Sequence, residues 1–264
     1  MTFPLTFHLG PFSINAHLVF EVLGITLGFR YFLYLRRQQT DHISESNRIW
    51  IFIGAAFGAL FFSRLVGSLE NPFIFFSAKN SFLYFYAHKT IVGALFGGLL
   101  CVELIKKIIG EQSSSGNLFV YPLLLGMMIG RIGCFSMGVY EQTYGIPSDL
   151  PWALDLGDGI LRHPVALYEI LFLGCLWGFL LLLEKKITFK EGLRFRFFLM
   201  AYFCFRFLLD FIKPGYKFSF GWSTIQITCL LGLLYYWQTF YALLMNPQVL
   251  LQYPSKKTNP TIIN

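Results

Sequence analysis

Long apolar runs separated by short polar breaks make up most of this sequence. The hydrocarbon core of a bilayer is about 30 Å thick, so an α-helix needs roughly 20 mostly apolar residues to cross it. The runs that approach this length predict membrane spans at about His17–Leu35, Ile49–Leu69, Ile91–Ile105, Leu118–Met137, Val165–Leu183, Phe195–Ile212 and Trp222–Met245. The expected fold class is therefore all-α, a polytopic membrane protein with about seven transmembrane helices.

Two segments between the predicted spans have different patterns. Residues 71–89 are aromatic but are interrupted by proline and polar residues, which favours a re-entrant or interfacial segment over a span. The segment at about 138–164 is rich in proline, glycine and aspartate, and we expect it to form an ordered loop region on the outer surface. Because no internal repeat is evident, we expect one integral-membrane domain over residues 1–264.

Small residues inside the spans predict packing rather than chemistry. Glycines recur four residues apart, at 24 and 28, 54 and 58, and 93 and 97, so each pair lies on one helical face where backbones can approach closely. The five cysteines form no C-x-x-C pair, which favours small buried side chains over a disulfide framework or metal ligands. We therefore expect no metal and no cofactor.

Composition and charge support the membrane interpretation and give it an orientation. Of the 264 residues 55% are hydrophobic and only 13% are charged, which exceeds what one soluble core uses. By the positive-inside rule, the distribution of lysine and arginine predicts an outer N-terminus and a cytoplasmic C-terminus. The net charge of +7 then reflects topology and attraction to anionic headgroups, and nothing in the sequence resembles a nucleic-acid-binding module.

Four arginines lie at membrane depth in this topology, namely Arg30, Arg64, Arg131 and Arg206. A charge at that depth is costly, so each guanidinium should face protein, water or a headgroup. Arg30 and Arg64 lie near the ends of their spans, where snorkelling towards the interface explains them equally well. Arg131 and Arg206 are therefore the stronger functional candidates.

Acidic and phenolic side chains accompany these arginines. Tyr202, Arg206 and Asp210 follow each other at intervals of four, which places them on one face of the sixth span. A guanidinium grips phosphate oxygens with two parallel hydrogen bonds, so two arginines on different helices could hold a phospholipid phosphodiester. A nearby carboxylate or imidazole would accept a proton from an incoming nucleophile. The alternative is an intramembrane ion pair that only fixes helix register.

Five stretches carry a resemblance to a known family: "LGPFSINAHLVFEVLG", "GRIGCF", "YGIPSDLPWALDLGDG", "RHPVALYE" and "YFCFRFLLDFIKP". Together, and in this order, they resemble the prolipoprotein diacylglyceryl transferases of the bacterial inner membrane. Members of that family move the diacylglyceryl group of phosphatidylglycerol to the thiol of a lipobox cysteine, which is the first step of lipoprotein maturation. The resemblance implies the same thioether-forming transfer here, without a metal. Phosphatidylglycerol and the signal-peptide region of a prolipoprotein are the implied partners.

The resemblance also assigns roles to individual positions. Arg131 and Arg206 match the two family arginines that bind or stabilise the lipid phosphate, and Asp210 stands where the family has a glutamate. Further positions that match the family pattern in the substrate-binding region are Glu141, Gly145, His163, Tyr168, Glu169 and Tyr202. For His163 a hydrogen bond that fixes the loop is the favoured role, and for Tyr168 and Tyr202 packing is favoured over orientation of the arginines.

Three positions depart from the family pattern. Cys134 replaces the signature asparagine, His17 replaces a tyrosine in the first span, and Val92 replaces the histidine proposed as the base. The base therefore remains open between His17, His88 and Glu141. A thiolate at Cys134 would be stabilised beside Arg131, but in the implied reaction the thiol of the substrate is the nucleophile.

Two other functions stay open at this point. Val92 and Cys134 motivate a non-catalytic or differently reacting lipid-binding paralogue. A small-solute transporter that uses the polar stripe of the sixth span is the second alternative, and the absence of a sequence repeat counts against it.

Overall fold

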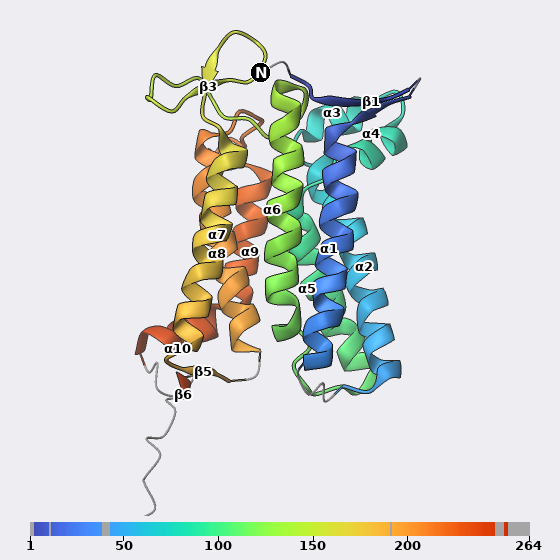
Figure 1. Cartoon of the computed structure of the whole chain (residues 1–264), viewed down its shortest axis with the longest axis vertical. Coiled ribbons are helices and arrows are strands. Elements are labelled where there is room, and N and C mark those ends of the chain that lie inside the picture. The colour runs from blue at the N-terminus through green and yellow to red at the C-terminus, as the bar shows by residue number, and fades with distance from the viewer. Residues whose placement is uncertain (1–2, 11, 39–42, 191, 246–250, 253–264) are drawn as a thin grey trace, which may run out of the picture.

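The chain folds into a helical bundle whose ends carry short elements (Figure 1). The computed structural model describes residues 3–10, 12–38, 43–190, 192–245 and 251–252. The α-helices are α1 (Ala16–Gln38), α2 (Glu45–Ser68), α3 (Pro72–Ser77), α4 (Ser81–Ala87), α5 (Ile91–Ile109), α6 (Val120–Met137), α7 (Val165–Glu184), α8 (Leu193–Leu209), α9 (Thr224–Tyr235) and α10 (Trp237–Met245). Three 3₁₀ turns extend them, η1 (Asn117–Phe119), η2 (Gly138–Tyr140) and η3 (Asp210–Ile212).

The strands form three separate antiparallel pairs. The strands are β1 (Thr6–Leu9), β2 (Phe12–Asn15), β3 (Leu154–Asp155), β4 (Leu161–Arg162), β5 (Thr188–Phe189) and β6 (Leu251–Gln252). The pairs are β1–β2, with Thr6 opposite Asn15, then β3–β4 and β5–β6. The β1–β2 hairpin and the β3–β4 loop lie at the same end of the bundle as α3 and α4, whereas β5 and β6 lie at the opposite end (Figure 1).

Four helical segments of the described residues are long and apolar enough to cross a membrane. They are α1, α2, residues 117–140 around α6, and α7. Helix α5 is not among the four because it carries charged residues near its end, among them Lys106 and Lys107. Helices α8 and α9 are not among them because they are shorter, at 17 and 12 residues. The chain is therefore a multi-pass membrane protein, as its hydrophobic runs predict.

The predicted seventh span, Trp222–Met245, is wrong as a single helix. It contains two helices, α9 and α10, and Tyr236 between them leaves helical geometry. The backbone N–H of Tyr236 bonds to the carbonyls of Leu233 and Leu234, which closes the end of α9. At 1.5 Å per residue α9 is about 18 Å long, and α10 then turns away from the bundle axis (Figure 1). Hydropathy alone did not reveal this break because the residues on both sides of it are apolar and aromatic.

Residues 71–89 form the short helices α3 and α4 instead of a span, as expected from their interrupted pattern. The glycine pairs also mark close helix contacts. A Cβ atom on Gly58 would lie 2.3 Å from the carbonyl oxygen of Gly97, so α2 and α5 touch backbone to backbone. A Cβ atom on Gly24 would lie 2.8 Å from the carbonyl oxygen of Gly126, which brings α1 equally close to α6.

The largest buried apolar cluster lies among α5, α6, α7, α8 and α9. Leu124, Leu173, Phe198 and Phe203 are fully buried in it. Helices α6, α7 and α8, which carry the arginines and acids singled out above, are thus held together by apolar packing along their length. The last turns of α6 and the first turns of α7 lie at the end of the bundle that carries the β3–β4 loop (Figure 1).

Candidate active site

Glu169 joins the two arginines that the sequence singles out. Its Oε1 lies 2.7 Å from Arg131 Nε, and its Oε2 lies 3.2 Å from Arg206 Nη1. The hydroxyl of Tyr202 donates a 2.7 Å hydrogen bond to Oε1 of the same carboxylate. The side chain of Glu169 is only 1% exposed. Three helices, α6, α7 and α8, therefore meet at one buried carboxylate.

Local sequence explains how these side chains converge. Tyr202 and Arg206 lie four residues apart on α8, so both reach the same point on α7. Helix α7 begins directly after Pro164, which places Glu169 in its second turn, opposite the last turns of α6. The helical spacing thus predicts the shared face of Tyr202 and Arg206 correctly, but it did not name Glu169 as their common partner.

Asp210, the third member of the predicted stripe, has a different partner. It lies in η3, and its carboxylate accepts a hydrogen bond from the hydroxyl of Ser223. Ser223 is the N-cap of α9 and forms a capping box with Gln226. Asp210 therefore ties the end of α8 to the start of α9, and its carboxylate is hydrogen-bonded to Ser223 rather than to the guanidinium of Arg206.

The charges around Glu169 do not cancel. Two guanidinium groups face one carboxylate, which leaves the group with one more positive than negative charge. Arg206 is 3% exposed, and among the described residues its Nε has no hydrogen-bond partner. A buried unpaired donor is costly, and a charged one more so, unless a ligand supplies an acceptor. The arrangement is therefore complementary to a bound anion.

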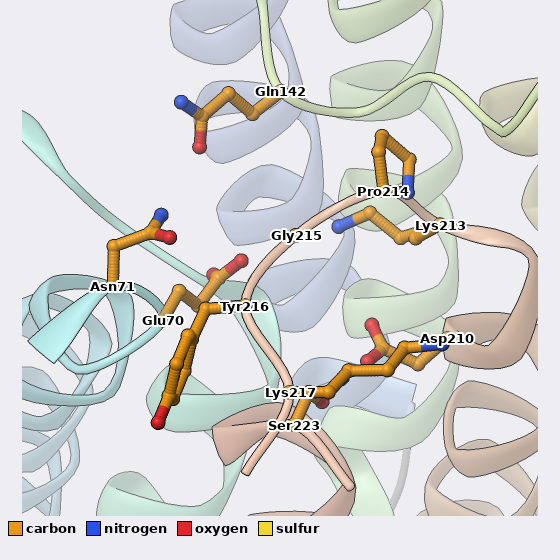
Figure 2. A pocket seen from close by; sticks show the side chains of 10 residues that line it. All are labelled: Glu70, Asn71, Gln142, Asp210, Lys213, Pro214, Gly215, Tyr216, Lys217 and Ser223. Atoms are coloured by element: carbon orange, nitrogen blue, oxygen red, sulfur yellow. Dashed lines mark hydrogen bonds between the residues drawn. The ribbon is translucent and has the colours of Figure 1, made fainter. Parts of the chain in front are cut away.

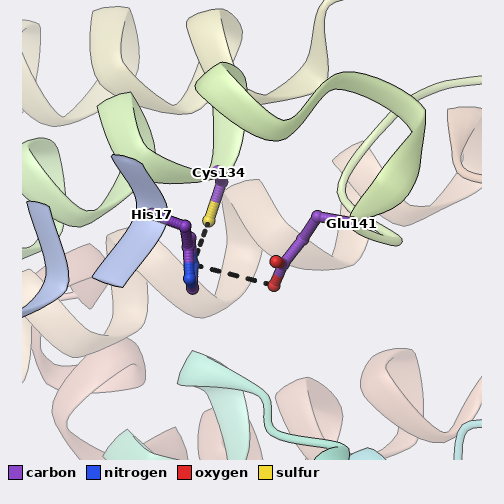
Figure 3. A group of neighbouring side chains, drawn as sticks. All are labelled: His17, Cys134 and Glu141. Carbon is purple, nitrogen blue, oxygen red and sulfur yellow. Dashed lines mark hydrogen bonds and ion pairs between the residues drawn. The ribbon is translucent and has the colours of Figure 1, made fainter. Parts of the chain in front are cut away.

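A second polar group lies against Arg131. Arg131 Nη1 lies 3.5 Å from Cys134 Sγ, and Cys134 Sγ lies 3.7 Å from Nε2 of His17. The same His17 nitrogen lies 3.7 Å from Oε1 of Glu141, so the sulfur and the carboxylate approach one ring atom (Figure 3). On the other side of the ring, Nδ1 lies 3.9 Å from Glu21. The chain thus brings His17, Cys134 and Glu141 together from α1, α6 and the residues after η2.

The oxygen, nitrogen and sulfur atoms that these three side chains offer all lie within 4.8 Å of one another. Imidazole, thiolate and carboxylate are the usual ligands of zinc in proteins. The absence of a C-x-x-C pair is therefore a weak argument against metal ligation here, because the three ligands come from separate elements. The sequence does not show that His17 on α1 and Cys134 on α6 lie next to each other.

His88, another candidate for the base, lies elsewhere. Its Nδ1 donates a 2.8 Å hydrogen bond to the carbonyl of Tyr84, and its ring stacks on the Tyr84 ring at a centroid distance of 3.8 Å. Among the contacts of the described residues, none joins His88 to Arg131 or Arg206. Val92, at the position of the family histidine, is fully buried in the apolar cluster.

The loop between α6 and α7 is fixed by His163, Tyr168 and Gly145. His163 Nδ1 lies 3.1 Å from the hydroxyl of Tyr168, which also accepts a 2.8 Å hydrogen bond from Nε1 of Trp152. The backbone N–H of Gly145 donates to the carbonyl of His163. A Cβ atom on Gly145 would lie 2.5 Å from the Cβ of His163, so only glycine fits this approach.

A polar pocket lies between the end of α2, the residues after η2 and the segment after η3 (Figure 2). The side chains of Glu70 and Lys213 reach into it from opposite sides, and Asp210 and Gln142 also line it. Burial lowers the pKa of Lys213 and raises the pKa of Glu70. Neither residue was among the site candidates from the sequence, although Lys213 belongs to the "DFIKP" stretch and directly follows η3.

The other two arginines at membrane depth are separate from this region. Arg30 is exposed on α1, whereas Arg64 donates to the carbonyl of Leu60 and lies 5.0 Å from the ring centroid of Tyr86. These contacts lie near the end of α2, in agreement with the alternative that Arg64 snorkels towards the interface.

The fold and the site define a multi-pass membrane protein whose helices bring two arginines to one buried carboxylate. A model of the prolipoprotein diacylglyceryl transferase family matches residues 4–243. The phosphatidylglycerol–prolipoprotein diacylglyceryl transferase of Bordetella bronchiseptica is 29% identical over 225 residues, which cover 80% of this chain and 82% of that protein. The transferase of the same name from Nitratidesulfovibrio vulgaris is 30% identical over 257 residues, with 86% and 89% covered. The chain therefore belongs to the prolipoprotein diacylglyceryl transferase family.

Proposed function

We propose that this chain transfers the diacylglyceryl group of phosphatidylglycerol to the lipobox cysteine of a prolipoprotein, in the bacterial inner membrane. Membership of the family makes the chain a transferase of lipoprotein maturation. The observation that carries the assignment of the site is the buried group in which Glu169 bridges Arg131 and Arg206.

The charge of this group supports a phosphodiester as its ligand. Phosphatidylglycerol carries one negative charge on its phosphate, and the two arginines with Glu169 carry one excess positive charge. The unpaired Nε of Arg206 offers a donor for a phosphate oxygen, and Arg131 offers its terminal nitrogens. The acyl chains would then lie along the apolar surfaces of the helices.

The reaction follows from this placement. The thiolate of the acceptor cysteine attacks the carbon of the diacylglyceryl group that is bonded to the phosphate oxygen. A C–S bond forms, and the C–O bond between that carbon and the phosphate oxygen breaks. The electron pair of that bond goes to the phosphate oxygen, and glycerol phosphate leaves with an additional negative charge. Two fixed guanidinium groups stabilise this developing charge more than they stabilise the starting diester, which is how they accelerate the step. The glycerol headgroup would lie towards the polar pocket around Lys213 and Asp210.

We assign the removal of the thiol proton to the group around His17. His17 lies one side chain away from Arg131, through Cys134, and it remains 17% exposed, so an acceptor thiol can reach it. Glu141 beside its Nε2 would stabilise the imidazolium that forms. His88 and Glu141 are the competing candidates for the base.

The proposed topology has seven passes and an outer N-terminus within a single domain. The helices that run along the long axis of the bundle support it, and they are α1, α2, α5, α6, α7, α8 and α9 (Figure 1). The end with the β1–β2 hairpin and the residues 138–164 would face outwards. Arg36, Arg37, Lys106 and Lys107, in the last turns of α1 and α5, would then lie on the cytoplasmic side.

A complementation experiment tests the function. In a bacterium depleted of its own transferase, expression of this chain should restore diacylglyceryl-modified lipoproteins, measured by mass spectrometry of the modified N-terminal peptides. Cognate prolipoproteins are expressed together with the chain. A stable, membrane-inserted chain that modifies none of them would overturn the proposal and leave a lipid-binding paralogue as the explanation.

Single substitutions in the same strain separate the candidate bases. His17→Asn should lower transfer by about 100-fold or more, the usual range for loss of a general base. His88→Asn should leave transfer near the wild-type level, because its ring contacts Tyr84. The reverse result would move the base to His88.

A further inference from the structure

We propose that His17, Cys134 and Glu141 form a binding site for one divalent zinc-like cation at the outer end of the bundle (Figure 3). The site goes beyond the proposed function, since a diacylglyceryl transfer onto a thiol can be written with arginines and a base alone. It rests on the geometry and chemistry of three side chains whose ligand atoms all lie within 4.8 Å of one another.

The distances are close to those of an occupied zinc site. Zinc binds imidazole nitrogen and carboxylate oxygen at about 2.0–2.2 Å and thiolate sulfur at about 2.3 Å in a tetrahedral arrangement, which puts neighbouring donors roughly 3.3–3.6 Å apart. Here Nε2 of His17 lies 3.7 Å from Cys134 Sγ and 3.7 Å from Glu141 Oε1. The two pairs that involve His17 need a contraction of a few tenths of an ångström, and the pair of Cys134 and Glu141, which lie within 4.8 Å, would close by up to about 1.2 Å.

The donor set selects the kind of metal. Nitrogen, sulfur and oxygen from His, Cys and Glu suit Zn²⁺ or Co²⁺, whereas Mg²⁺ and Ca²⁺ prefer oxygen ligands alone. A thiolate and a carboxylate together balance the charge of a divalent ion. Three protein ligands leave a fourth tetrahedral position open, which is the arrangement of reactive rather than purely structural zinc sites.

The surroundings also fit. Nδ1 of His17 lies 3.9 Å from Glu21, and a closer approach on metal binding would form the hydrogen bond to a carboxylate that orients a ligating histidine. Glu21 is itself held by Lys89, whose Nζ lies 2.6 Å from both of its oxygens. Arg131 Nη1 lies 3.5 Å from Cys134 Sγ, so the guanidinium is adjacent to the sulfur ligand.

An ion can enter from the surface. The side chains of His17 and Glu141 are 17% and 28% exposed, while Cys134 lies beneath them at 8%. A role for the ion in catalysis rests on the proposed function and replaces His17 as the base, because Nε2 of a ligating His17 has no free electron pair for a proton. The open position would receive the acceptor thiol and hold it as a thiolate beside Arg131, with the proton released to solvent.

Metal binding is tested without the transfer assay. The full chain is purified in detergent without a histidine tag, stripped with a chelator and titrated with Co²⁺. Binding through Cys134 should produce a thiolate-to-cobalt charge-transfer absorption in the near ultraviolet, with one Co²⁺ per chain. Zn²⁺ should abolish that band by displacement.

Variants locate the site. Cys134→Ser and His17→Asn should each weaken Co²⁺ binding by at least about 100-fold, because they remove the thiolate and the imidazole. Glu141→Gln should weaken it by about 10-fold, because the amide keeps an oxygen ligand. Cys175→Ser and His8→Gln change an exposed cysteine on α7 and an exposed histidine on β1, and they should leave the titration unchanged. Circular dichroism and size-exclusion profiles of each variant establish that it is folded.

Two results would overturn the site. One is a wild-type chain that takes up no more Co²⁺ than the folded Cys134→Ser variant. The other is a charge-transfer band that survives Cys134→Ser or His17→Asn. A chain that binds Co²⁺ as expected but fails the complementation test would retain the metal site and lose the proposed function, so the two failures are distinguishable.

Discussion

Oε1 of Glu169 lies 2.7 Å from Nε of Arg131, and both side chains come from helices that cross the bundle side by side. The other oxygen of Glu169 holds Arg206, so one carboxylate sets the separation of two guanidinium groups. Removing its charge would leave Arg131 and the buried Arg206 next to each other without the carboxylate between them.

Glu169→Gln should therefore affect both activity and stability. We expect transfer to fall at least about 100-fold, and the free energy of unfolding to drop by roughly 3 kcal/mol, as when one partner of a buried ion pair is removed. Lipoprotein modification per amount of membrane-inserted chain and thermal unfolding in detergent measure the two effects. Glu45→Gln removes half of an exposed pair with Arg36 and should cost less than about 1 kcal/mol. Equal losses in the two variants would contradict the central role of Glu169.

Arg131→Lys and Arg206→Lys keep the charge but remove the planar fork. Each should lower transfer about 100-fold, because an ammonium group cannot hold Glu169 and a phosphate oxygen with the same fixed geometry. Arg36→Lys, in the last turn of α1, is the matched control and should be neutral. Undiminished transfer by folded Arg131→Lys would rule out two-point recognition of the phosphate.

Gly145→Ala should displace the loop that leads into α7. Its Cβ would lie 2.5 Å from the Cβ of His163 and 2.7 Å from the His163 carbonyl oxygen, so the hydrogen bond between the two backbones must open. We expect faster hydrogen exchange at residues 144–146 and 161–165 together with reduced transfer. Gly174→Ala, on α7 where nothing lies within 4 Å, should instead stabilise the helix by up to about 1 kcal/mol.

The Asp158–Arg162 pair should make the β3–β4 loop sensitive to acid. Hydrogen bonding from Arg162 holds the pKa of Asp158 below its usual value of 3.8. A carboxylate whose folded-state pKa is lowered stabilises the fold above its unfolded pKa, and the stabilisation disappears as the pH falls through the folded value. Exchange protection at Ile160, whose backbone N–H donates to Oδ1 of Asp158, should therefore fall below about pH 4 after correction for the intrinsic pH effect.

The matched substitutions separate this pair from the rest of the loop. Asp158→Asn should show low protection at all pH values and lose the transition. Asp149→Asn, an exposed aspartate in the same loop, should keep it. A transition that persists in Asp158→Asn would assign the acid sensitivity to another carboxylate.

Helical periodicity and hydropathy predict α1, α2, α6 and α7 correctly, because an apolar run of spanning length has few alternatives in a chain of this composition. The same reasoning failed at Tyr236, where the break between α9 and α10 lies inside a continuous aromatic run. A change of direction within apolar sequence depends on what the next helix packs against, and hydropathy does not contain that information.

The site, too, could be predicted from the sequence only in part. Spacing along one helix predicts that Tyr202 and Arg206 share a face, and the cost of burying charge singles out Arg131. The partners depend on contacts between helices. Asp210 continues the spacing of Tyr202 and Arg206, yet it binds Ser223, while Glu169 from α7 supplies the carboxylate.

The sequence by itself determined that this chain crosses a membrane, where its long helices lie, and which arginines need a partner there. These properties follow from local composition and from the high energy of a charge in hydrocarbon. Only the tertiary structure decided that one carboxylate holds both arginines, and that His17, Cys134 and Glu141 meet beside them. Such meetings depend on how closely packed helices are placed relative to each other, and residues more than 100 positions apart carry no local sign of it.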